Sequence, residues 1–376
     1  MKISIIGGGI GGLATCLALS RAGIDATVYE RAPELKEIGA GISLWANAAR
    51  VLKKLGLLDT VLQHSERIDF IHVKSKQGAI IKRIRVNHYE VPAVCIHRAT
   101  LLEILREAIE PERITLGKTF ERYEQKADRV TAHFADGSQI ESDAIIGADG
   151  LKSAVRAQLK GSAPPVFRGY TVWRGIADYA PKNYERCTAS ETWSAGQRIG
   201  ITGIGNGRFY WYATDNQPEN KISSPVERKQ RLLELFKNWH EPIPQFIRAT
   251  DEKHILQNDC YDREPNKGWS DGKVLLIGDA AHPTTPNMGQ GGCMALEDSI
   301  VLTKCLQNET SIESAFRRFE NERFPRTQFI TKRSRQFGQI GQWQNPISTI
   351  LRNSLLRVYP ARLFELEQKS IHGFEA

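Results

Sequence analysis

The chain has 376 residues, of which 41% are hydrophobic and 25% charged, an ordinary globular composition long enough for two domains with substantial cores. Its six cysteines lack paired or metal-ligand spacing and no apolar run approaches a membrane span, so we expect reduced thiols, no metal and a cytoplasmic location. The net charge of +8 is spread along helices, and without a nucleic-acid-binding motif it argues against nucleic acid as partner, while an anionic substrate stays open.

The start of the chain predicts a strand, a glycine turn, a helix and a second strand. Gly7 allows the tight turn, Gly9 lets backbone approach a pyrophosphate, and Gly12 lets the helix pack on the strand. Glu30 ends the second strand, just before Arg31, where a carboxylate can accept both hydroxyls of an adenosine ribose. The segment therefore predicts dinucleotide binding, although the glycines do not distinguish FAD from NAD.

The next segments predict further contacts to such a ligand. Gly39 to Ser43 places glycines among small residues, which suggests backbone passing close to something flat, with a surface turn as the alternative. A helix is expected over 46–58 and two strands over 68–94. Arg98 begins an amphipathic helix, an unfavourable place for a cation unless it meets an anion such as a cofactor phosphate; the alternative is an exposed arginine.

Residues 113–146 predict three or four short strands, the last of which runs into Asp149. This carboxylate follows a buried strand, at the sheet edge where ligands bind in such folds. From 166 to 262 the character changes to long alternating strands, dense in aromatic residues, with a helix over 226–239. We expect a separate antiparallel or mixed sheet whose inner face can wall a pocket.

A strand over 272–277 then returns the chain to the first sheet and ends near Asp279, which can accept a sugar hydroxyl. His282 has no evident acid partner and is expected to stabilise the turn. A second glycine-rich helix start follows, with amides that can face an oxygen carrying negative charge: Gly289, Gly291 and Gly292.

The end of the chain predicts helices. Residues 311–337 form a charged helical stretch that we expect to be kinked or interrupted at Pro325. For residues 339–376 we expect a helix packed on the body rather than a membrane-surface anchor, and thus no membrane contact.

Together, the three glycine-acid segments resemble the fingerprints of class A flavoprotein monooxygenases, the family with the para-hydroxybenzoate hydroxylase fold. Residues 286–295 and 297–299 are most similar to zeaxanthin epoxidases, followed by urate hydroxylases and salicylate hydroxylases. The resemblance implies an α/β fold: a discontinuous FAD-binding Rossmann-like domain of glutathione reductase type, an inserted mixed β-sheet substrate domain, and C-terminal helices. The expected boundaries are 1–70, 96–165 and 263–338 for the first, 71–95 and 166–262 for the second, and 339–376 for the tail.

The resemblance also implies roles for the predicted site. Glu30 would take the adenosine ribose, Arg98 the phosphates or ribityl chain, and Asp279 the ribityl or pyrophosphate region. Asp149 is linked in the family to both FAD and NAD(P)H. The remaining cofactor positions are backbone or small residues near the pyrophosphate, the flavin ring and its N1–C2 edge: Gly7, Gly9, Gly12, Arg31, Ser43, Gly289, Gly291 and Gly292.

The implied reaction is hydride transfer from NADPH or NADH to FAD, reaction with O2 to a C4a-hydroperoxide, and insertion of one oxygen atom into a small aromatic or polyene substrate. An FAD-dependent oxidase or reductase without oxygen insertion is one alternative, and a noncatalytic flavin-binding protein is another. The assembly is expected to be a monomer or a homodimer.

The pocket candidates for catalysis are Arg174, Arg198 and Tyr210. Strand alternation puts Arg174 on one face with Tyr170, and Arg198 lies on a neighbouring strand, where urate hydroxylases carry a substrate-binding arginine. If both arginines face the flavin, we expect an anionic or enolisable substrate; the alternative is that they pair with surface acids. Asn287 stands where urate hydroxylases have an aspartate, and because an amide cannot act as that base, urate itself is a doubtful substrate.

Overall fold

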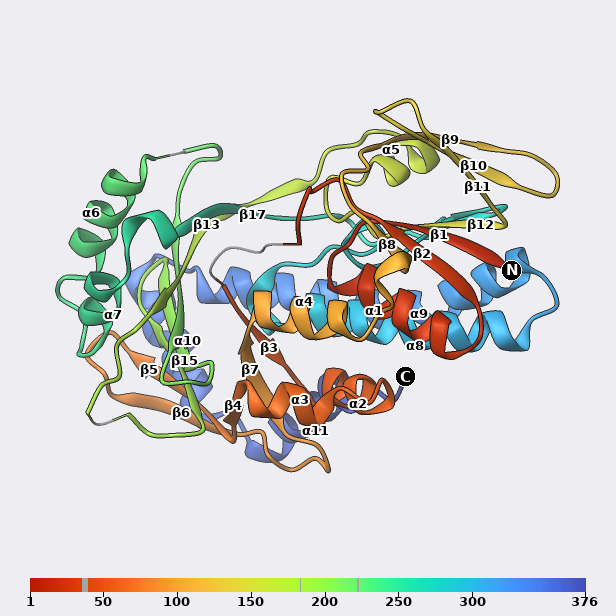
Figure 1. The fold of residues 1–376 in the computed structure, drawn as a ribbon. Helices are drawn as coiled ribbons and strands as arrows, with labels where there is room; N and C mark the ends of the chain where they lie inside the picture. Colours follow the sequence, from red (N-terminus) through yellow and green to blue (C-terminus); the bar gives the residue numbers. More distant parts are fainter. Residues whose placement is uncertain (36–39, 183, 222) are drawn as a thin grey trace.

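A six-stranded sheet organises one side of the molecule. The computed structural model describes residues 1–35, 40–182, 184–221 and 223–376. The sheet has the order β18-β19-β12-β1-β2-β8 and lies at the right of Figure 1. All its pairs are parallel except β18 with β19. Its strands are β1 (Lys2–Ile6), β2 (Asp25–Tyr29), β8 (Ile114–Thr115), β12 (Ala144–Gly147), β18 (Ser270–Asp271) and β19 (Val274–Leu276).

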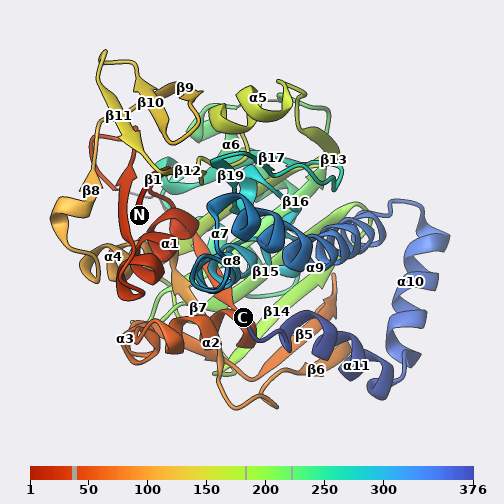
Figure 2. The same cartoon turned by 90° about the vertical axis from the view of Figure 1, so that its right-hand side faces the viewer.

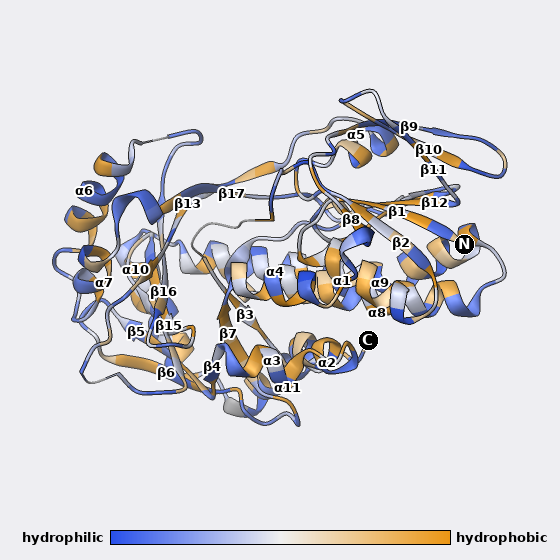
Figure 3. Cartoon of the chain, in the orientation of Figure 1, coloured by the Kyte–Doolittle hydropathy of each residue, from blue (hydrophilic) through white to orange (hydrophobic). Residues whose placement is uncertain are grey.

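The central strands of this sheet are largely buried and mostly apolar. Ile3, Ile5 and Ile6 of β1 are all buried, the pattern of a parallel strand covered on both faces. Figure 3 shows the same apolar colour along β1 and β12. Two helices, α1 (Ile10–Arg21) and α8 (Gly291–Asn308), pack closely on each other beneath the sheet, and α4 (Arg98–Glu107) lies against α1. This arrangement brings the starts of α1 and α8 together.

A seven-stranded mixed sheet forms the other side of the molecule, at the left of Figure 1. One face carries Trp173, Ile199 and Trp211, which pack on α6 (Pro225–Phe236) and α7 (Ile243–Ala249). The opposite face points toward the first sheet. In spatial order its strands are β17 (Leu256–Asp262), β13 (Val166–Ala177), β16 (Phe209–Asn216), β15 (Gln197–Gly203), β14 (Thr188–Trp193), β5 (Phe70–Ser75) and β6 (Ile80–Arg85).

Two small antiparallel sheets complete the architecture. One consists of β3 (Gly41–Leu44), β7 (Ala93–His97) and β4 (Ser65–Ile68) and connects the two sides; the other consists of β9 (Phe120–Gln125), β10 (Val130–Phe134) and β11 (Gln139–Ser142). The shorter helices are α2 (Ala46–Lys54), α3 (Leu58–Gln63) and α5 (Ala154–Lys160). The predicted α/β class with a mixed sheet and C-terminal helices is confirmed, while the proposed domain boundaries stay a prediction.

The helical end of the chain differs from its prediction in two respects. Pro325 does not interrupt α9 (Ile312–Gly341), which runs through it as one helix because Phe319, Arg323, Thr327 and Ile330 are buried on both sides of the proline. The tail is two helices rather than one, α10 (Pro346–Val358) and α11 (Ala361–His372), separated at Pro360. Figure 2 shows α10 at the right-hand edge of the molecule, with α11 below it. In the described part of the chain, no helix is both long and apolar enough to cross a membrane.

Candidate active site

A cavity of about 1070 Å³ lies between the six-stranded sheet and the inner face of the seven-stranded sheet. The starts of α1 and α8 form one wall, β3 passes along it, and β13 to β16 form the opposite wall. Side chains from α9, α10 and α11 line the remaining side. The cavity therefore lies beyond the carboxyl ends of β1 and β19, where open α/β sheets bind ligands.

Two helix N-termini face this cavity without a side chain to cap them. In the described structure neither Gly9, before α1, nor Gln290, before α8, makes a side-chain cap, and neither first turn contains an acid. Unpaired amides and the helix dipole give each terminus a partial positive charge. A Cβ on Gly11 would stand 3.3 Å from Ala295, so the two helices approach closely enough to present both termini to one elongated ligand. The pair fits a ligand with more than one anionic or electron-rich part.

The three glycines of the first turn have different physical roles. Gly7 has φ +112°, and a Cβ there would lie 2.5 Å from the Ala148 carbonyl oxygen. A Cβ on Gly12 would lie 2.0 Å from the Gly7 carbonyl oxygen, so the first turn of α1 needs a residue without a side chain. Gly9 has ordinary extended backbone, lines the cavity, and would have no atom within 4 Å of an added Cβ. Gly7 and Gly12 fold the turn, whereas Gly9 leaves room for a ligand.

The predicted polar cofactor residues fall into two groups. Arg98 and Asp279 both line the cavity, as does Ser43 of β3. The Asp279 side chain is accessible from the cavity, but protein surrounds that cavity. The resulting loss of solvation raises the pKa of the carboxyl, while His282 and Arg98 act in the opposite direction. Glu30 is half-buried at the end of β2, and its carboxylate accepts hydrogen bonds from the backbone amides of Gly8 (2.6 Å) and Ala32 (2.9 Å).

Three predicted residues with polar side chains lie outside this lining, as do the turn glycines Gly7 and Gly12. Glu30 is one, although its bond to the glycine turn fixes it beside the start of α1. Arg31 is exposed. Asp149 is half-buried and accepts hydrogen bonds from the amides of Ala154 (2.7 Å) and Val155 (3.2 Å) at the start of α5. Burial raises its pKa, and its other oxygen, Oδ1, is buried without a partner in the part of the chain that is described.

We predicted that residues 39–43 lie along the flavin ring. Gly39 lies outside the described residues; Ala40 and the β3 residues Gly41 to Ser43 line the cavity. Gly289 has φ +60°, and a Cβ there would stand 2.9 Å from the Trp45 indole nitrogen. Gly291 and Gly292 form the first turn of α8, also on the lining. The chain thus brings the glycines of the second helix start against β3.

His282 does have an acid partner, contrary to the expectation from sequence. Its Nε2 lies 2.7 Å from Asp298 Oδ2, which also accepts the Gly278 amide (2.9 Å). Burial raises the pKa of Asp298, but His282 and Arg323 outweigh it, so the net direction is downward. Arg323 is fully buried between Asp298 and Glu297, at 2.7 Å from each. The sequence does not reveal this partner because Asp298 lies sixteen residues further on, within the following helix α8. The cluster holds the turn carrying Asp279 against α8.

All three predicted catalytic residues line the cavity on the inner face of the large sheet. Arg198 is 1% exposed and is held by Glu191 (3.1 Å), Asn287 (2.6 Å) and Gln342 (2.9 Å). Burial lowers the pKa of Arg198, but Glu191 together with the surrounding Tyr170, Tyr212 and Cys260 acts upward and prevails, so the guanidinium stays charged. The sequence left open whether Arg198 faces the flavin or pairs with a surface acid. Arg198 lines the cavity and pairs with an acid, Glu191, which is itself buried.

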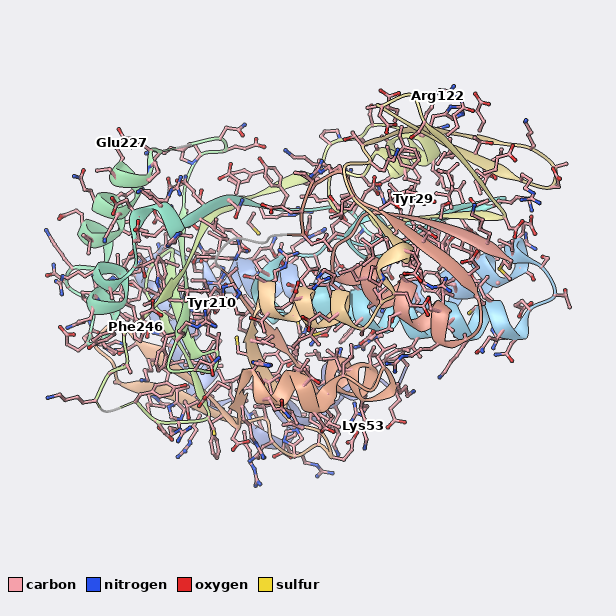
Figure 4. The ribbon with its side chains drawn as sticks, viewed as in Figure 1. Tyr29, Lys53, Arg122, Tyr210, Glu227 and Phe246 are labelled. Atoms are coloured by element: carbon pink, nitrogen blue, oxygen red, sulfur yellow. The ribbon has the colours of Figure 1, made fainter. Side chains whose placement is uncertain are left out.

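Arg174 and Tyr210 lie nearer the cofactor side of the cavity. Arg174 is half-buried and donates to the neutral Asn258 side chain at 3.2 Å. Tyr210 packs against β3, since a Cβ on Gly41 would lie 2.4 Å from its ring. Figure 4 shows Tyr210 on the inner side of the sheet and Phe246 of α7 on the outer side. Burial raises the pKa of the Tyr210 phenol, which keeps it protonated and able to donate.

Sequence reasoning missed several residues of the cavity. Glu191 is an acid inside an otherwise weakly polar strand, a signal that was present, whereas Gln342 joins Arg198 only through the fold. Trp45 lines the cavity and stacks on His372 of α11, with ring centroids 4.6 Å apart. Burial lowers the pKa of His372 to about 3, so it is neutral. These contacts tie the C-terminal helices to the site.

A parallel sheet with two uncapped glycine-rich helix starts and a facing mixed sheet defines the class of FAD-dependent oxidoreductases with a substrate sheet. The chain belongs to the FAD binding domain family, whose model matches residues 1–334. The predictions of a class A flavin monooxygenase fold, of FAD as cofactor and of an FAD-dependent monooxygenase activity are confirmed by these relationships.

Relatives cover nearly the whole chain. The chain is 39% identical over 362 residues to the aurachin C monooxygenase/isomerase of Stigmatella aurantiaca, covering 95% of this chain and 94% of the relative. It is 32% identical to the FAD-dependent urate hydroxylase of Klebsiella oxytoca, covering 89% of each. The structure of Klebsiella pneumoniae HpxO complexed with FAD and uric acid superposes with a TM-score of 0.92 at 28% identity, covering 99% of this chain and 96% of that one.

Proposed function

We propose that this monooxygenase uses NADPH or NADH to insert one oxygen atom into a small hydroxylated aromatic or heteroaromatic ring held between Tyr210 and the Arg198–Asn287 pair. One substrate molecule, O2, NAD(P)H and a proton would give the oxygenated product, water and NAD(P)⁺. Bound FAD supplies the electron transfer and the activation of O2. The chain's part is to hold FAD and substrate side by side and to exclude water.

The observation that carries the substrate proposal is the charge balance around Arg198. Glu191 already offsets the guanidinium, and Asn287, at 2.6 Å, is neutral. Tyr170 also bonds to Asn287, at 3.0–3.2 Å. The groups around Arg198 therefore offer donors and acceptors with the charge of Arg198 itself offset, which favours ring hydroxyl, carbonyl or enol groups over a substrate that needs a general base at position 287.

We assign the cofactor positions by the same geometry. Gly9 and the α1 amides would hold the pyrophosphate, with Glu30 on the adenosine ribose and Asp279 and Arg98 on the ribityl–pyrophosphate region. The α8 amides from Gly289 to Gly292 would face the flavin's electron-rich edge, along β3. Asp149, whose second oxygen is buried, would help to bind FAD or NAD(P)H rather than the substrate. Arg174 and Tyr210 would lie between cofactor and substrate.

The test is an anaerobic stopped-flow trace of flavin absorbance against NADH and NADPH, with and without candidate substrates. The panel follows the relatives, with aurachin C, 3-amino-4-hydroxybenzoate and urate, together with isoprenoids lacking an aromatic ring. An aromatic ligand that speeds reduction about tenfold or more, equal to about 1.4 kcal/mol in barrier, supports the proposal. Acceleration by urate alone contradicts the inference drawn from Asn287, and acceleration by isoprenoids alone contradicts the ring class proposed here.

A further inference from the structure

The two C-terminal helices carry a series of large exposed apolar side chains. Ile347 is 77% exposed and Val358 72%. Four of the α10 residues follow at intervals of four, four and three, so they share one helix face. We call this surface the outer apolar stripe; its members are Ile347, Ile350, Leu351, Leu355 and Val358 of α10 with Leu363 and Leu366 of α11. Single exposed aliphatic residues need no explanation, but a stripe of this length marks an interaction surface.

The helices α10 and α11, which carry the stripe, are held against the rest of the protein by their inner faces. Arg352, on the inner side of α10, is 3% exposed and donates to the Gly341 and Ser194 carbonyl oxygens at 3.0 and 3.2 Å. Its guanidinium lies over the Trp193 ring, 5.0 Å from the centroid. At the other end, Arg326 donates to the Ile371 carbonyl oxygen at 2.9 Å. The inner faces are thus occupied, and the outer faces are what remains.

The exposed charges next to the stripe are mainly positive. They are Arg357, Arg362 and Lys369, together with one exposed acid, Glu365. Trp343 precedes α10, and Tyr359 lies between the two helices. An apolar face with arginines and aromatic rings at its margins has the chemistry of a helix that lies in the interface of an anionic membrane.

A second copy of this chain is the competing occupant, and its charges fit less well. In a twofold dimer the same patch packs against itself, so Arg357, Arg362 and Lys369 would approach their own copies with Glu365 as the one exposed acid beside them. Glu367 pairs with Arg333 of the same chain. An anionic surface meets the arginines with opposite charge instead.

We propose that the outer apolar stripe binds peripherally to an anionic lipid bilayer, with α10 and α11 lying in the interface. This replaces the expectation of a tail packed on the body alone. Leu355 belongs to the stripe and also lines the cavity, as do its neighbours Leu356 and Tyr359. The bound face therefore includes part of the cavity wall, which would let an apolar part of a substrate pass between bilayer and cavity.

The experiment is vesicle flotation of the FAD-loaded protein. We expect binding to vesicles of phosphatidylcholine with phosphatidylglycerol at least about tenfold stronger than to phosphatidylcholine alone. The variant Ile347→Ser/Leu351→Ser/Val358→Ser should reduce that binding at least about tenfold, because it removes exposed apolar surface only. The matched control Val166→Ser/Val226→Ser changes exposed valines elsewhere and should bind like the wild type.

Two results would overturn the proposal. One is a wild-type protein that does not float with the anionic vesicles. The other is a stripe variant that floats equally well while sedimentation velocity shows that it has lost a dimer, which makes the stripe a contact between copies. If the triple variant loses flavin or helical signal, Arg357→Glu/Arg362→Glu replaces it, with the same expected loss. Substrate-stimulated flavin reduction in detergent-free buffer tests the monooxygenase separately, so each idea can fail without the other.

Discussion

The two halves of the cavity are built by different means. The cofactor half consists mainly of backbone: two helix starts and a strand, which come from three short segments of the chain. The substrate half consists of side chains that meet only in the fold, since Arg198 bonds to Asn287 and Gln342, which are 89 and 144 residues away in the chain. Changes in the first half should therefore act on folding and FAD affinity, and changes in the second on the reaction with FAD still bound.

The largest effect should come from the glycine turn. There, substitution of Gly12 should disturb the fold, whereas substitution of Gly9 should disturb ligand binding alone. Gly12→Ala places a methyl 2.0 Å from the Gly7 carbonyl oxygen and should abolish FAD binding by displacing the start of α1. Gly9→Ala meets nothing within 4 Å, so the apoprotein should keep its stability to within about 0.5 kcal/mol. Titration of the apoproteins with FAD should nevertheless show at least about tenfold weaker binding for Gly9→Ala. Unchanged affinity would move the pyrophosphate away from Gly9.

The buried ion cluster sharpens the same comparison on the side of stability. Arg323→Met leaves Glu297 and Asp298 buried without their shared cation and should cost about 3–5 kcal/mol in urea unfolding. Arg318→Met, on the same helix, removes exposed pairs with Glu322 and Glu309 and should cost less than about 1 kcal/mol. Equal costs for the two variants would show that the cluster does not hold α8 and α9 together.

On the substrate side, Glu191→Gln removes the charge that offsets Arg198 while keeping the shape of the side chain. We expect kcat/KM for the accelerating substrate to fall about 10–100-fold, or about 1.4–2.7 kcal/mol, with flavin content unchanged. Glu185→Gln, an exposed glutamate paired with Arg83, is the control and should leave both unchanged. Loss of flavin from the Glu191 variant would erase the distinction between the two halves.

The smallest expected effect concerns His372, which ties α11 to the cavity by stacking on Trp45. The unfolded chain binds this proton below about pH 6.5, whereas the folded chain does so only near a pKa of about 3. Because the unfolded state then binds more protons, stability falls as the pH drops from 7 toward 3. Between pH 7 and 5.5 the wild type should lose about 1 kcal/mol more than His372→Gln, measured by urea unfolding at both pH values. If the stability of the wild type and of His372→Gln changes equally with pH, His372 is exposed to solvent in the folded protein and its pKa is not lowered.

The same contrast explains what the sequence could predict. Gly7, Gly12 and Glu30 can be predicted from the sequence, because the tight turn and its spacing to the second strand require these residue types within one short segment. The face of Arg174 follows from strand alternation, and Arg198 is indicated by the resemblance to urate hydroxylases. Their partners did not, because Asn287 and Gln342 reach Arg198 through tertiary packing that no local pattern encodes. Likewise α9 continues through Pro325 because distant packing outweighs a local rule.

The central claim, a monooxygenase reaction in this cavity, is tested most directly with ¹⁸O2. Enzyme, NAD(P)H and the ligand that accelerates flavin reduction are combined under labelled oxygen, and product mass is compared with the amounts of NAD(P)H consumed and hydrogen peroxide formed. The account predicts one ¹⁸O atom in each product molecule, with one NAD(P)H used and little peroxide. Unlabelled ligand with peroxide matching the NAD(P)H consumed, for every ligand that accelerates reduction, would contradict it and identify an oxidase.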